Sequence, residues 1–411
     1  MSSAVQMALI NKKRILKCWT ALMLAVLVLM YGEWTEFRPE SSKKTEIKSI
    51  LFWNGAKRSE MIIFGTGHDA FVQQGCPVSD CEIISSPYQF PDRPLDSYDA
   101  IIFNFNDEFW LKRRPKFQRR TDQIFVFFTQ EPPPSIESMN ISDYDNYFNM
   151  TMTYRMDSDV RLLYGRIQPA NTIAQLRRKK KRTKRKAYVA AMISHCRTDG
   201  RREEYIKRLK KHVKVDVYGY CNAEGPSQLH CETDELLSSV PECYDMLESN
   251  YKFYLSFENS ICPDYVTEKF FHIMARDIVP VVYGGADYAA IAPAHSYIDA
   301  LDYEPKELAQ LLRRLAANET LYDEYFNWKK NYVVETGLTQ MVRHGFCDLC
   351  RILHQRDGQR KTYSSLMNRW DPSLCRVPKF AREDGQQPHK RRDNNKTSSS
   401  NVMDYLFHRH L

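Results

Sequence analysis

Polar side chains that can do chemistry follow an apolar run in the segment YKFYLSFENSICPDYVTEKFF, residues 251–271. The first part of this segment is aromatic and apolar, which predicts a buried strand, and Lys269 begins a second apolar stretch that favours a helix. Glu268 and Lys269 together suit a ligand that carries sugar hydroxyls and a phosphate. Strand, polar loop and helix are typical of the carboxyl edge of an open α/β sheet, where ligands bind. The alternative is an ordinary surface loop in which Thr267 caps the helix.

Several segments resemble one enzyme family. The string FENS followed by DYVTEK resembles the signature of the α1,3-fucosyltransferases, which are inverting enzymes that use GDP-fucose. Further matching segments occur in the family's order: TYRMDSDVRLLYG at 153–165, MISHCRTDGRREEYIKRL at 192–209 with VDVYG at 215–219, and IVPVVYGG at 278–285. Together they cover most of residues 100–350. The resemblance is specific for the family and much less so for the acceptor.

The N-terminus carries the strongly hydrophobic run CWTALMLAVLVLMY at 18–31. Basic residues precede it and glutamates follow it, so the positive-inside rule leaves the N-terminus cytosolic. We predict a cytosolic tail at 1–14, a single-pass signal anchor at 15–31 and a stem at 32–47. A cleaved signal peptide is the alternative, but no small-residue cleavage site follows the run. A short span suits the secretory pathway, and we expect a type II protein of the Golgi membrane.

The composition is that of a globular protein of two ordinary domains, because 411 residues can bury two full cores. Apolar, strand-like runs lie at 48–52, 61–64, 100–105 and 124–128. From residue 187 strands alternate with amphipathic helices at 201–211, 268–275 and 305–317, which indicates parallel βα units.

We therefore predict an α/β protein. The family resemblance implies a GT-B architecture, in which two Rossmann-like domains face a cleft. The predicted domains are an N-terminal acceptor-side domain at 48–176, a basic linker at 177–186 and a C-terminal GDP-fucose-binding domain at 187–355. A polar, partly disordered tail follows at 356–411. The linker also suits a nucleic-acid partner, but that interpretation conflicts with the anchor, so no nucleic-acid partner is predicted.

Cysteines and sequons agree with a luminal chain. Of the 11 cysteines, Cys18 lies in the predicted anchor and ten remain, an even count that suggests disulfides. The CDLC string at 347–350 is by itself compatible with a redox pair or half a zinc site. The resemblance implies instead that Cys76 and Cys81 pair with Cys347 and Cys350. Glycosylation sequons occur at four asparagines: Asn140, Asn149, Asn318 and Asn395.

The resemblance also assigns donor-binding residues. Arg202 matches the family arginine and is expected to begin a helix, where its guanidinium and the helix amides bind the diphosphate together with Lys269. Ser194 ends a strand beside His195, which stands where the family commonly has asparagine and can replace it as a donor. The remaining matches, of which Glu268 corresponds to the residue that touches the fucose hydroxyls, are Tyr164, Tyr254, Asn259, Tyr265 and Glu268.

Glu131, in the string FFTQEPPPSI, is our prediction for the catalytic base. It takes the place of the family's glutamate in a Glu-x-Pro segment, and Pro132 stands where serine is usual. Such a base removes the proton of the acceptor hydroxyl. Without the resemblance, a surface glutamate before a rigid proline turn is an equally good interpretation.

Asp157 and Asp159 form a D-x-D triplet, which in other glycosyltransferases ligates a divalent metal. Within the family's segment we expect both to be structural and no metal site or cofactor to be required, with stimulation by a divalent metal left open. The predicted partners are GDP-fucose, an N-glycan acceptor and the membrane. The sequence predicts no oligomeric state.

The acceptor is predicted from residues 104–107 (NFND), where enzymes acting on Lewis-type antennae carry a histidine-rich segment. That departure resembles the plant and invertebrate enzymes that fucosylate the 3-OH of the innermost N-acetylglucosamine (GlcNAc) of N-glycans. Lewis-type or LacdiNAc antennae are the alternative acceptors. A noncatalytic luminal sugar-binding relative is the alternative from another class.

Overall fold

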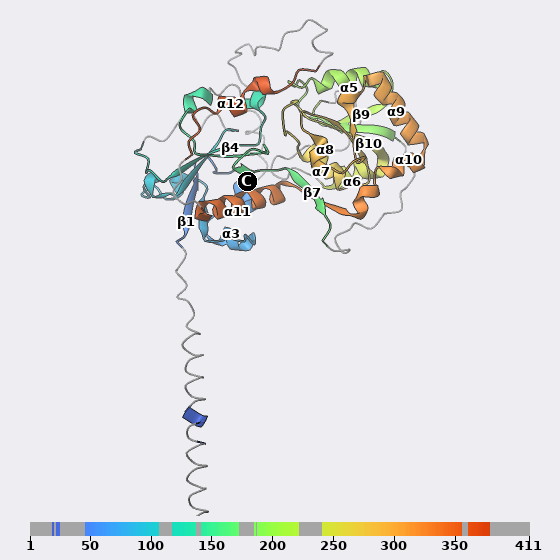
Figure 1. Ribbon diagram of the computed structural model, residues 1–411. Helices are drawn as coiled ribbons and strands as arrows, with labels where there is room; N and C mark the ends of the chain where they lie inside the picture. Colours follow the sequence, from blue (N-terminus) through green and yellow to red (C-terminus); the bar gives the residue numbers. More distant parts are fainter. Residues whose placement is uncertain are drawn as a thin grey trace, which may run out of the picture. The chain divides into compact units, whose positions relative to one another are not determined.

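The computed structural model describes most of the chain from residue 46 onward (Figure 1). The described residues are 19, 22–24, 46–106, 117–136, 141–171, 185, 187–221, 241–355 and 361–378. The chain divides into two compact units, Met1–Ile47 and Lys48–Leu411. Within the described ranges, no helix is both long and apolar enough to cross a membrane. The predicted cytosolic tail, nearly all of the predicted anchor, stem and linker, and the sequons at Asn140 and Asn395 lie outside the described residues.

A parallel sheet forms the first half of the second unit. From edge to edge its strands are β2 (Cys81–Ile84), β1 (Lys48–Phe52), β3 (Ala100–Asn104), β4 (Ile124–Thr129), β5 (Met150–Thr153) and β6 (Val160–Arg161). All residues of β3, β4 and β5 are buried, as expected for apolar strands covered on both faces. The strand prediction at 61–64 is wrong, since these residues belong to helix α2 (Ser59–Phe64). Met61 and Phe64 are buried while Ile62 is 56% exposed, the spacing of a helix face.

A second parallel sheet forms the other half. Its strands, in spatial order, are β12 (Ile298–Asp299), β11 (Val279–Tyr283), β10 (Tyr251–Phe257), β8 (Ala187–Met192) and β9 (Val215–Tyr218). In both sheets the first strand in sequence lies between the second and the third, which is the order of doubly wound folds. The direction in which successive strands are added across the sheet therefore reverses between β1 and β3 and again between β8 and β10, although all these strands run parallel. These sheets confirm the predicted α/β class with two Rossmann-like halves.

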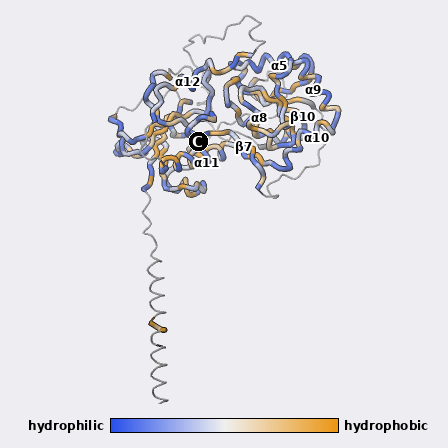
Figure 2. Tube along the Cα trace, in the orientation of Figure 1, coloured by the Kyte–Doolittle hydropathy of each residue, from blue (hydrophilic) through white to orange (hydrophobic). Residues whose placement is uncertain are grey.

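Helices connect the strands of each half. Besides α2, the α-helices are α3 (Asp69–Gln73), α5 (Arg202–Lys210), α6 (Pro241–Asn250), α7 (Glu268–Met274), α8 (Tyr288–Ile291), α9 (Pro305–Ala317), α10 (Glu319–Glu324), α11 (Leu338–Gln355) and α12 (Met367–Trp370). Short 3-10 helices are η1 (Pro87–Gln89), η2 (Leu95–Ser97), η3 (Pro133–Ile136), η4 (Ile141–Tyr144), η6 (Ala300–Asp302), η7 (Asn327–Lys330) and η8 (Pro372–Leu374). The trace of α5 at the periphery is mostly hydrophilic, whereas hydrophobic stretches concentrate in the interior of each half (Figure 2).

Two crossings join the halves. Strand β7 (Gly165–Pro169) leads out of the first half and pairs antiparallel with β13 (Tyr332–Thr336), which leads back to α11. Side chains of α11 such as Val342 and Phe346 then join the core of the first sheet. Residues 338–355, which the sequence interpretation counted in the C-terminal domain, therefore contribute to the first hydrophobic core.

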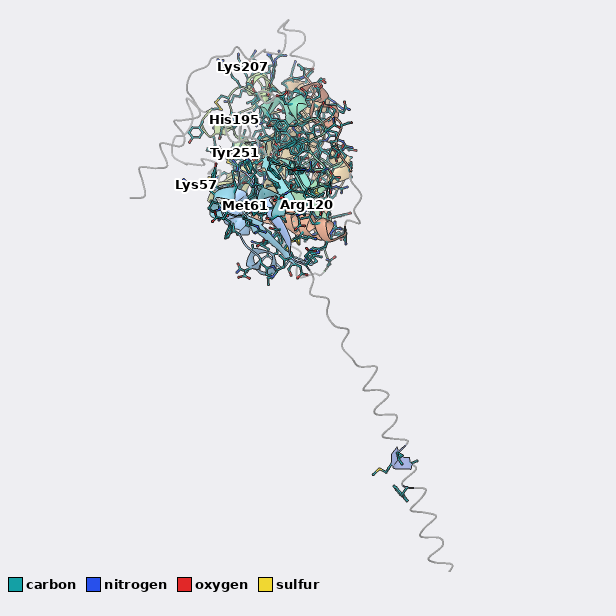
Figure 3. The ribbon with its side chains drawn as sticks, turned by 90° about the vertical axis from the view of Figure 1, so that its left-hand side faces the viewer. Lys57, Met61, Arg120, His195, Lys207 and Tyr251 are labelled. Carbon is teal, nitrogen blue, oxygen red and sulfur yellow. A yellow bond between two sulfur atoms is a disulfide. The ribbon has the colours of Figure 1, made fainter. Side chains whose placement is uncertain are left out.

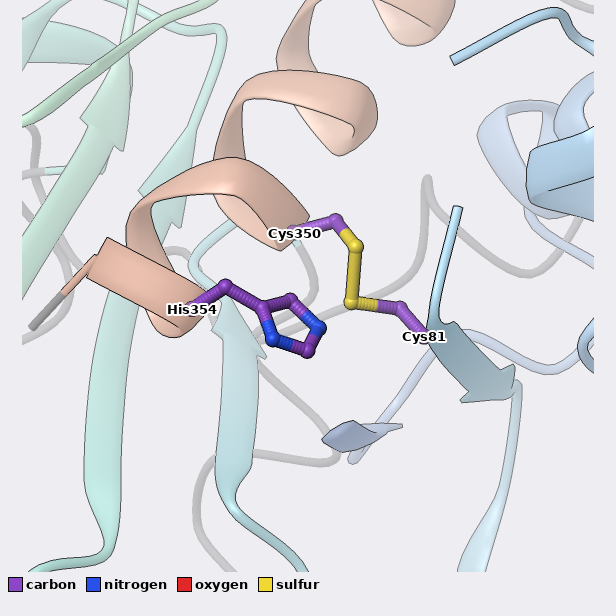
Figure 4. A group of neighbouring side chains, drawn as sticks. All are labelled: Cys81, Cys350 and His354. Atoms are coloured by element: carbon purple, nitrogen blue, oxygen red, sulfur yellow. A yellow bond between two sulfur atoms is a disulfide. The ribbon is translucent and has the colours of Figure 1, made fainter. Parts of the chain in front are cut away.

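Disulfides fasten α11 to the first sheet. Cys76 is bonded to Cys347 and Cys81 to Cys350, which confirms the pairing implied by the resemblance. His354, one turn beyond Cys350, lies beside the second bond (Figure 4). Both sulfur atoms there are used in the disulfide and are not thiolate ligands for a metal. The CDLC string is thus neither a redox pair nor half a zinc site.

Asn149 corrects one glycosylation prediction. Its side chain is 6% exposed, its Oδ1 accepts a hydrogen bond from the Phe125 amide at 3.0 Å, and its Nδ2 donates to the Lys361 carbonyl at 3.2 Å. A glycan on a buried amide with both ends used is incompatible with this packing. Asn318, by contrast, is exposed, caps α10 through its Oδ1, and stays a predicted glycosylation site.

Candidate active site

Arg202 lies next to β8 and β10, where the strand order of the second sheet reverses. It begins α5, as predicted, and its side chain is only 2% exposed. Its Nη1 donates to the Phe257 carbonyl at 2.7 Å and its Nη2 to the His195 carbonyl at 3.3 Å. Burial lowers the pKa of this guanidinium, although the negative charge on Glu258 acts in the opposite direction. One buried positive charge thus ties together the segments that follow β8 and β10.

The segment around Glu258, Glu268 and Lys269 forms a second cluster at the same edge. Lys269 Nζ lies 2.8 Å from Glu268 and 3.6 Å from Glu258, and it donates to Thr267 Oγ1 at 2.9 Å. Glu258 is completely buried and accepts hydrogen bonds from the Thr267 amide at 2.8 Å and from its hydroxyl at 2.9 Å. Glu258 therefore fixes the residue before α7 and, with it, the start of the helix that carries Lys269.

Burial affects the three charged groups of this cluster differently. It raises the pKa of Glu258, and the charge on Lys269 offsets the rise only in part. For Glu268, burial also acts to raise the pKa, but the charge and hydrogen bond of Lys269 lower it on balance. Burial acts to lower the pKa of Lys269, while the charges on Glu268 and Glu258 raise it above its ordinary value. Lys269 therefore stays a cation between the buried carboxyl group of Glu258 and the half-buried one of Glu268.

The other predicted donor residues surround these two clusters. Tyr254 and Tyr265 are buried, and burial raises the pKa of each phenol. The Asn259 carbonyl accepts a hydrogen bond from Gly200 at 2.7 Å, and a Cβ at Gly200 would lie 2.9 Å from that carbonyl oxygen. Glycine is therefore required for this close approach. Asn259 Oδ1 is buried without a hydrogen-bond partner among the described residues.

Ser194 and His195 lie at the end of β8 but differ in exposure. Ser194 is half-buried, whereas the His195 side chain is exposed (Figure 3). The backbone carbonyl of His195 accepts a hydrogen bond from Arg202. The next residue, Cys196, is bonded to Cys221 and so fastens this loop to the end of β9. The sequence interpretation did not predict this bond.

Glu131 lies in the first half, directly after β4. Thr129 Oγ1 accepts a hydrogen bond from the Glu131 amide at 3.1 Å, and Tyr164 donates to the neighbouring Gln130 carbonyl at 2.9 Å. Burial raises the pKa of Tyr164 and of Tyr265, and the negative charge on Glu131 raises both further. The charge on Glu268 acts on the same two phenols. Glu131 of the first half and Glu268 of the second therefore act on the same two tyrosines, of which Tyr265 is buried and Tyr164 half-buried.

Asp157 and Asp159 are held by other protein groups. Asp157 accepts hydrogen bonds from Arg155 at 2.9 Å and from Arg369 at 2.8 Å. Asp159 accepts from the Thr151 amide at 2.8 Å and from the Tyr363 hydroxyl at 2.6 Å. Both carboxylates therefore hold other protein groups in place, which agrees with the structural role that we predict for them.

The structure adds Glu258 to the residues that sequence reasoning selected. Its position was marked by the same FENS string, but a glutamate after an apolar strand gives no sign of whether it meets solvent or the start of a distant helix. The carboxylate of Glu258 is completely buried against Lys269, which indicates that Glu258 holds the start of α7 in place.

Comparison with known proteins identifies the chain. A family model for the N-terminal domain of fucosyltransferases matches residues 45–165. A second model, for the C-terminal domain of glycosyltransferase family 10 (fucosyltransferase), matches residues 179–370. The chain is also 36% identical, over 323 residues, to alpha-(1,3)-fucosyltransferase C of Drosophila melanogaster, which covers 74% of this chain and 71% of that protein. The chain belongs to glycosyltransferase family 10.

This fucosyltransferase is similar to further members. It shares 31% identity over 351 residues with glycoprotein 3-alpha-L-fucosyltransferase A of Drosophila melanogaster, covering 82% of this chain and 63% of that protein. A crystal structure of an α1,3-fucosyltransferase with GDP-fucose superimposes with a TM-score of 0.49 at 14% identity, covering 78% of this chain and 94% of the other. As a member of this family the chain is an α1,3-fucosyltransferase.

Proposed function

We propose that this fucosyltransferase moves L-fucose from GDP-β-L-fucose to the 3-OH of GlcNAc on glycoprotein N-glycans, with inversion at the fucose anomeric carbon. The observation that carries the proposal is electrostatic. The charges on Glu131 and Glu268 act on the same two phenols, Tyr164 and Tyr265. This shared pair of phenols supports a single site, to which Glu131 contributes a carboxylate and Arg202 and Lys269 contribute positive charge.

The departing diphosphate is stabilised by Lys269 and Arg202 in this proposal. Lys269 is 21% exposed, and its ammonium group, which contacts Thr267 and Glu268, suits direct contact with phosphate oxygens. Arg202 is nearly inaccessible, and its charge acts from beneath the loops that follow β8 and β10. Positive charge at this position lowers the barrier because the leaving oxygens gain negative charge as the bond to fucose breaks.

Glu131 acts as the general base. Its carboxylate takes the proton of the acceptor 3-OH while that oxygen forms a bond to C1 of fucose on the face opposite the diphosphate. The bond between C1 and the β-phosphate oxygen breaks at the same time, and GDP departs with the electron pair. The donor's β-linkage thereby becomes an α-linkage in the product.

The innermost GlcNAc of the N-glycan is the acceptor that we propose. Two observations support this acceptor. Residues 104–107 lack the histidine-rich segment, and one relative is named a glycoprotein 3-alpha-L-fucosyltransferase. Asn104 is the last residue of β3, next to β1, where the strand order of the first sheet reverses. Its backbone forms two hydrogen bonds, of 2.8 and 2.9 Å, with the side chain of Asn54. This polar position lies at the ligand-binding edge of such sheets. Lewis-type or LacdiNAc antennae are the competing acceptors.

We further propose that the chain is a single-pass type II protein of the Golgi membrane with its catalytic unit in the lumen. Disulfides support an oxidising compartment, because the described residues contain the bonds Cys76–Cys347, Cys81–Cys350, Cys196–Cys221 and Cys262–Cys375. The hydrophobic run at 18–31 supports the anchor. Protease protection of the luminal unit in intact microsomes tests this topology, and digestion without detergent would contradict it.

The function is tested by incubating the full chain in detergent with GDP-fucose and a panel of acceptors. The panel contains N-glycans with an unsubstituted core, LacNAc and LacdiNAc, and mass spectrometry with linkage analysis identifies the product. We expect fucose in α1,3 linkage on the core GlcNAc. Transfer to antennae alone would overturn the proposed acceptor, and GDP binding without any transfer would favour the noncatalytic alternative.

A further inference from the structure

The C-terminal strap, defined here as residues 361–378, follows α11 in the sequence and also packs on the first half. Its side chains Tyr363, Leu366 and Trp370 are 6%, 1% and 2% exposed. They belong to the apolar core beneath the first sheet, where the Trp370 ring lies 5.5 Å from that of Phe127. This part of the polar tail is therefore packed into the catalytic unit.

The D-x-D triplet anchors one part of the strap. Arg369 Nη1 lies 2.8 Å from Asp157, and Lys361 Nζ lies 3.3 Å from Asp159. The Tyr363 hydroxyl donates to Asp159 as well. Burial acts to raise the pKa of Asp159, but the hydrogen bonds from Tyr363 and Thr151 and the charge on Lys361 lower it on balance. Each aspartate therefore forms an ion pair with a cationic side chain of the strap.

The other part of the strap is bonded to the signature loop, defined as residues 258–267, between β10 and α7. Cys375 forms a disulfide with Cys262, and the Arg376 amide donates to the Ile261 carbonyl at 2.8 Å. The signature loop also contains Asn259 and Tyr265, both predicted donor-binding residues. A covalent bond therefore joins the C-terminus of the catalytic unit to the middle of the donor-binding loop.

A series of tilted aromatic ring contacts makes a second connection between the strap and the signature loop. The Trp370 ring centroid lies 5.4 Å from that of Tyr154, and Tyr154 lies 4.9 Å from Tyr265. The Asp264 carboxylate accepts a hydrogen bond from the Met156 amide at 3.1 Å, one residue before Asp157. The signature loop of the second half is thus held by the D-x-D segment and the strap at the same time.

We propose that the C-terminal strap positions the signature loop for GDP-fucose, and that Asp157, Asp159 and Cys262 are positioning residues for the donor. The inference rests on the proposed function, because it takes the signature loop to be part of the donor site. Without the strap, the loop is fixed at its two ends by β10 and α7, while its middle loses its bond to the first half. Pre-ordering the loop lowers the entropy cost of binding the donor.

The first experiment exchanges the charges of the Asp157–Arg369 pair in the full chain, with Arg155→Gln as the reference background, because Arg155 is the second cationic partner of Asp157. Asp157→Arg and Arg369→Asp alone should each raise KM for GDP-fucose about fivefold, the upper range for a partly exposed ion pair. The double variant should restore KM, and kcat and the pH profile should stay unchanged throughout. If Asp157 instead acts through a metal ion, the double variant remains impaired, and that result overturns the proposal.

The second experiment removes the bond between strap and loop. Cys262→Ser with Cys375→Ser should weaken GDP binding in calorimetry about tenfold or more, because small displacements of a positioned group have large effects. The matched control is Cys76→Ser with Cys347→Ser, which removes a disulfide outside the signature loop and should leave GDP affinity unchanged.

The two experiments separate the strap from the proposed function. If the wild-type chain neither binds GDP nor transfers fucose, the proposed function fails. If the wild-type chain does both, and the Cys262 and Cys76 double variants bind GDP equally well, the strap proposal alone is wrong. The charge exchange leaves all disulfides intact, so it decides the question even where a cysteine variant does not fold.

Discussion

Replacing Lys269 with methionine removes the ammonium between the buried carboxyl group of Glu258 and the half-buried one of Glu268. In the wild-type chain Lys269 Nζ lies 3.6 Å from Glu258 and 2.8 Å from Glu268. Glu258 is completely buried and burial already raises its pKa, so in Lys269→Met it is the group that takes up a proton. We therefore expect the variant to be destabilised by the free energy of protonating Glu258.

The size of this effect depends on pH. Protonating a glutamate whose unfolded pKa is about 4.3 takes about 3.7 kcal/mol at pH 7 and about 1 kcal/mol at pH 5. In the variant the folded-state pKa of Glu258 lies above its unfolded value. The native state then binds the extra proton, and stability falls as the pH rises above the unfolded pKa. Lys269→Met should accordingly lose about 3–4 kcal/mol of unfolding free energy at pH 7 and about 1 kcal/mol at pH 5.

Chemical denaturation of the full chain at both pH values, with a calorimetric titration of GDP at pH 7, measures these quantities. The matched control is Lys252→Met. Lys252 is also mostly buried, but its partner Glu319 is 71% exposed and stays charged in water without Lys252. The control should lose similar stability at both pH values and keep its GDP affinity. An equal loss at pH 5 and pH 7 for Lys269→Met, or unchanged GDP affinity, would refute the reasoning.

Three further predictions concern other groups of the site. Glu131→Gln should abolish fucosyl transfer and leave GDP affinity nearly intact; transfer at the wild-type rate would remove Glu131 as the base. Arg202→Lys should lose about 1.5–3 kcal/mol of unfolding free energy and about tenfold in GDP affinity, since lysine lacks the fork that contacts the Phe257 and His195 carbonyls. Unchanged denaturation and calorimetry would contradict this. Burial lowers the pKa of His272 to about 4, so the wild-type chain should lose up to about 3 kcal/mol as the pH falls from 6.5 to 4. His272→Phe should show a shallower loss in denaturation, and equal slopes would exclude His272 as the cause.

Local sequence patterns predicted most elements that position the site. Apolar runs predicted β3, β4 and β10, and amphipathic spacing predicted α5 and α9, because neighbouring residues show by their pattern whether one or two faces are buried. The failure at 61–64 has the same origin. Four apolar residues are too few to distinguish a strand from a helix turn, and here the packing of Met61 and Phe64 decided the outcome.

Contacts between distant segments were beyond any local pattern. The D-x-D pattern of Asp157 and Asp159 did not reveal that a strap some 200 residues later in the chain places Arg369 and Tyr363 beside them. Asn149 matched a sequon, but the Phe125 and Lys361 backbones occupy its amide. The sequence alone determined which groups are candidates for fucosyl transfer and on which element most of them lie. Only the tertiary structure decided which of those groups are buried, paired or held in place, because pairing depends on how the chain brings distant residues together.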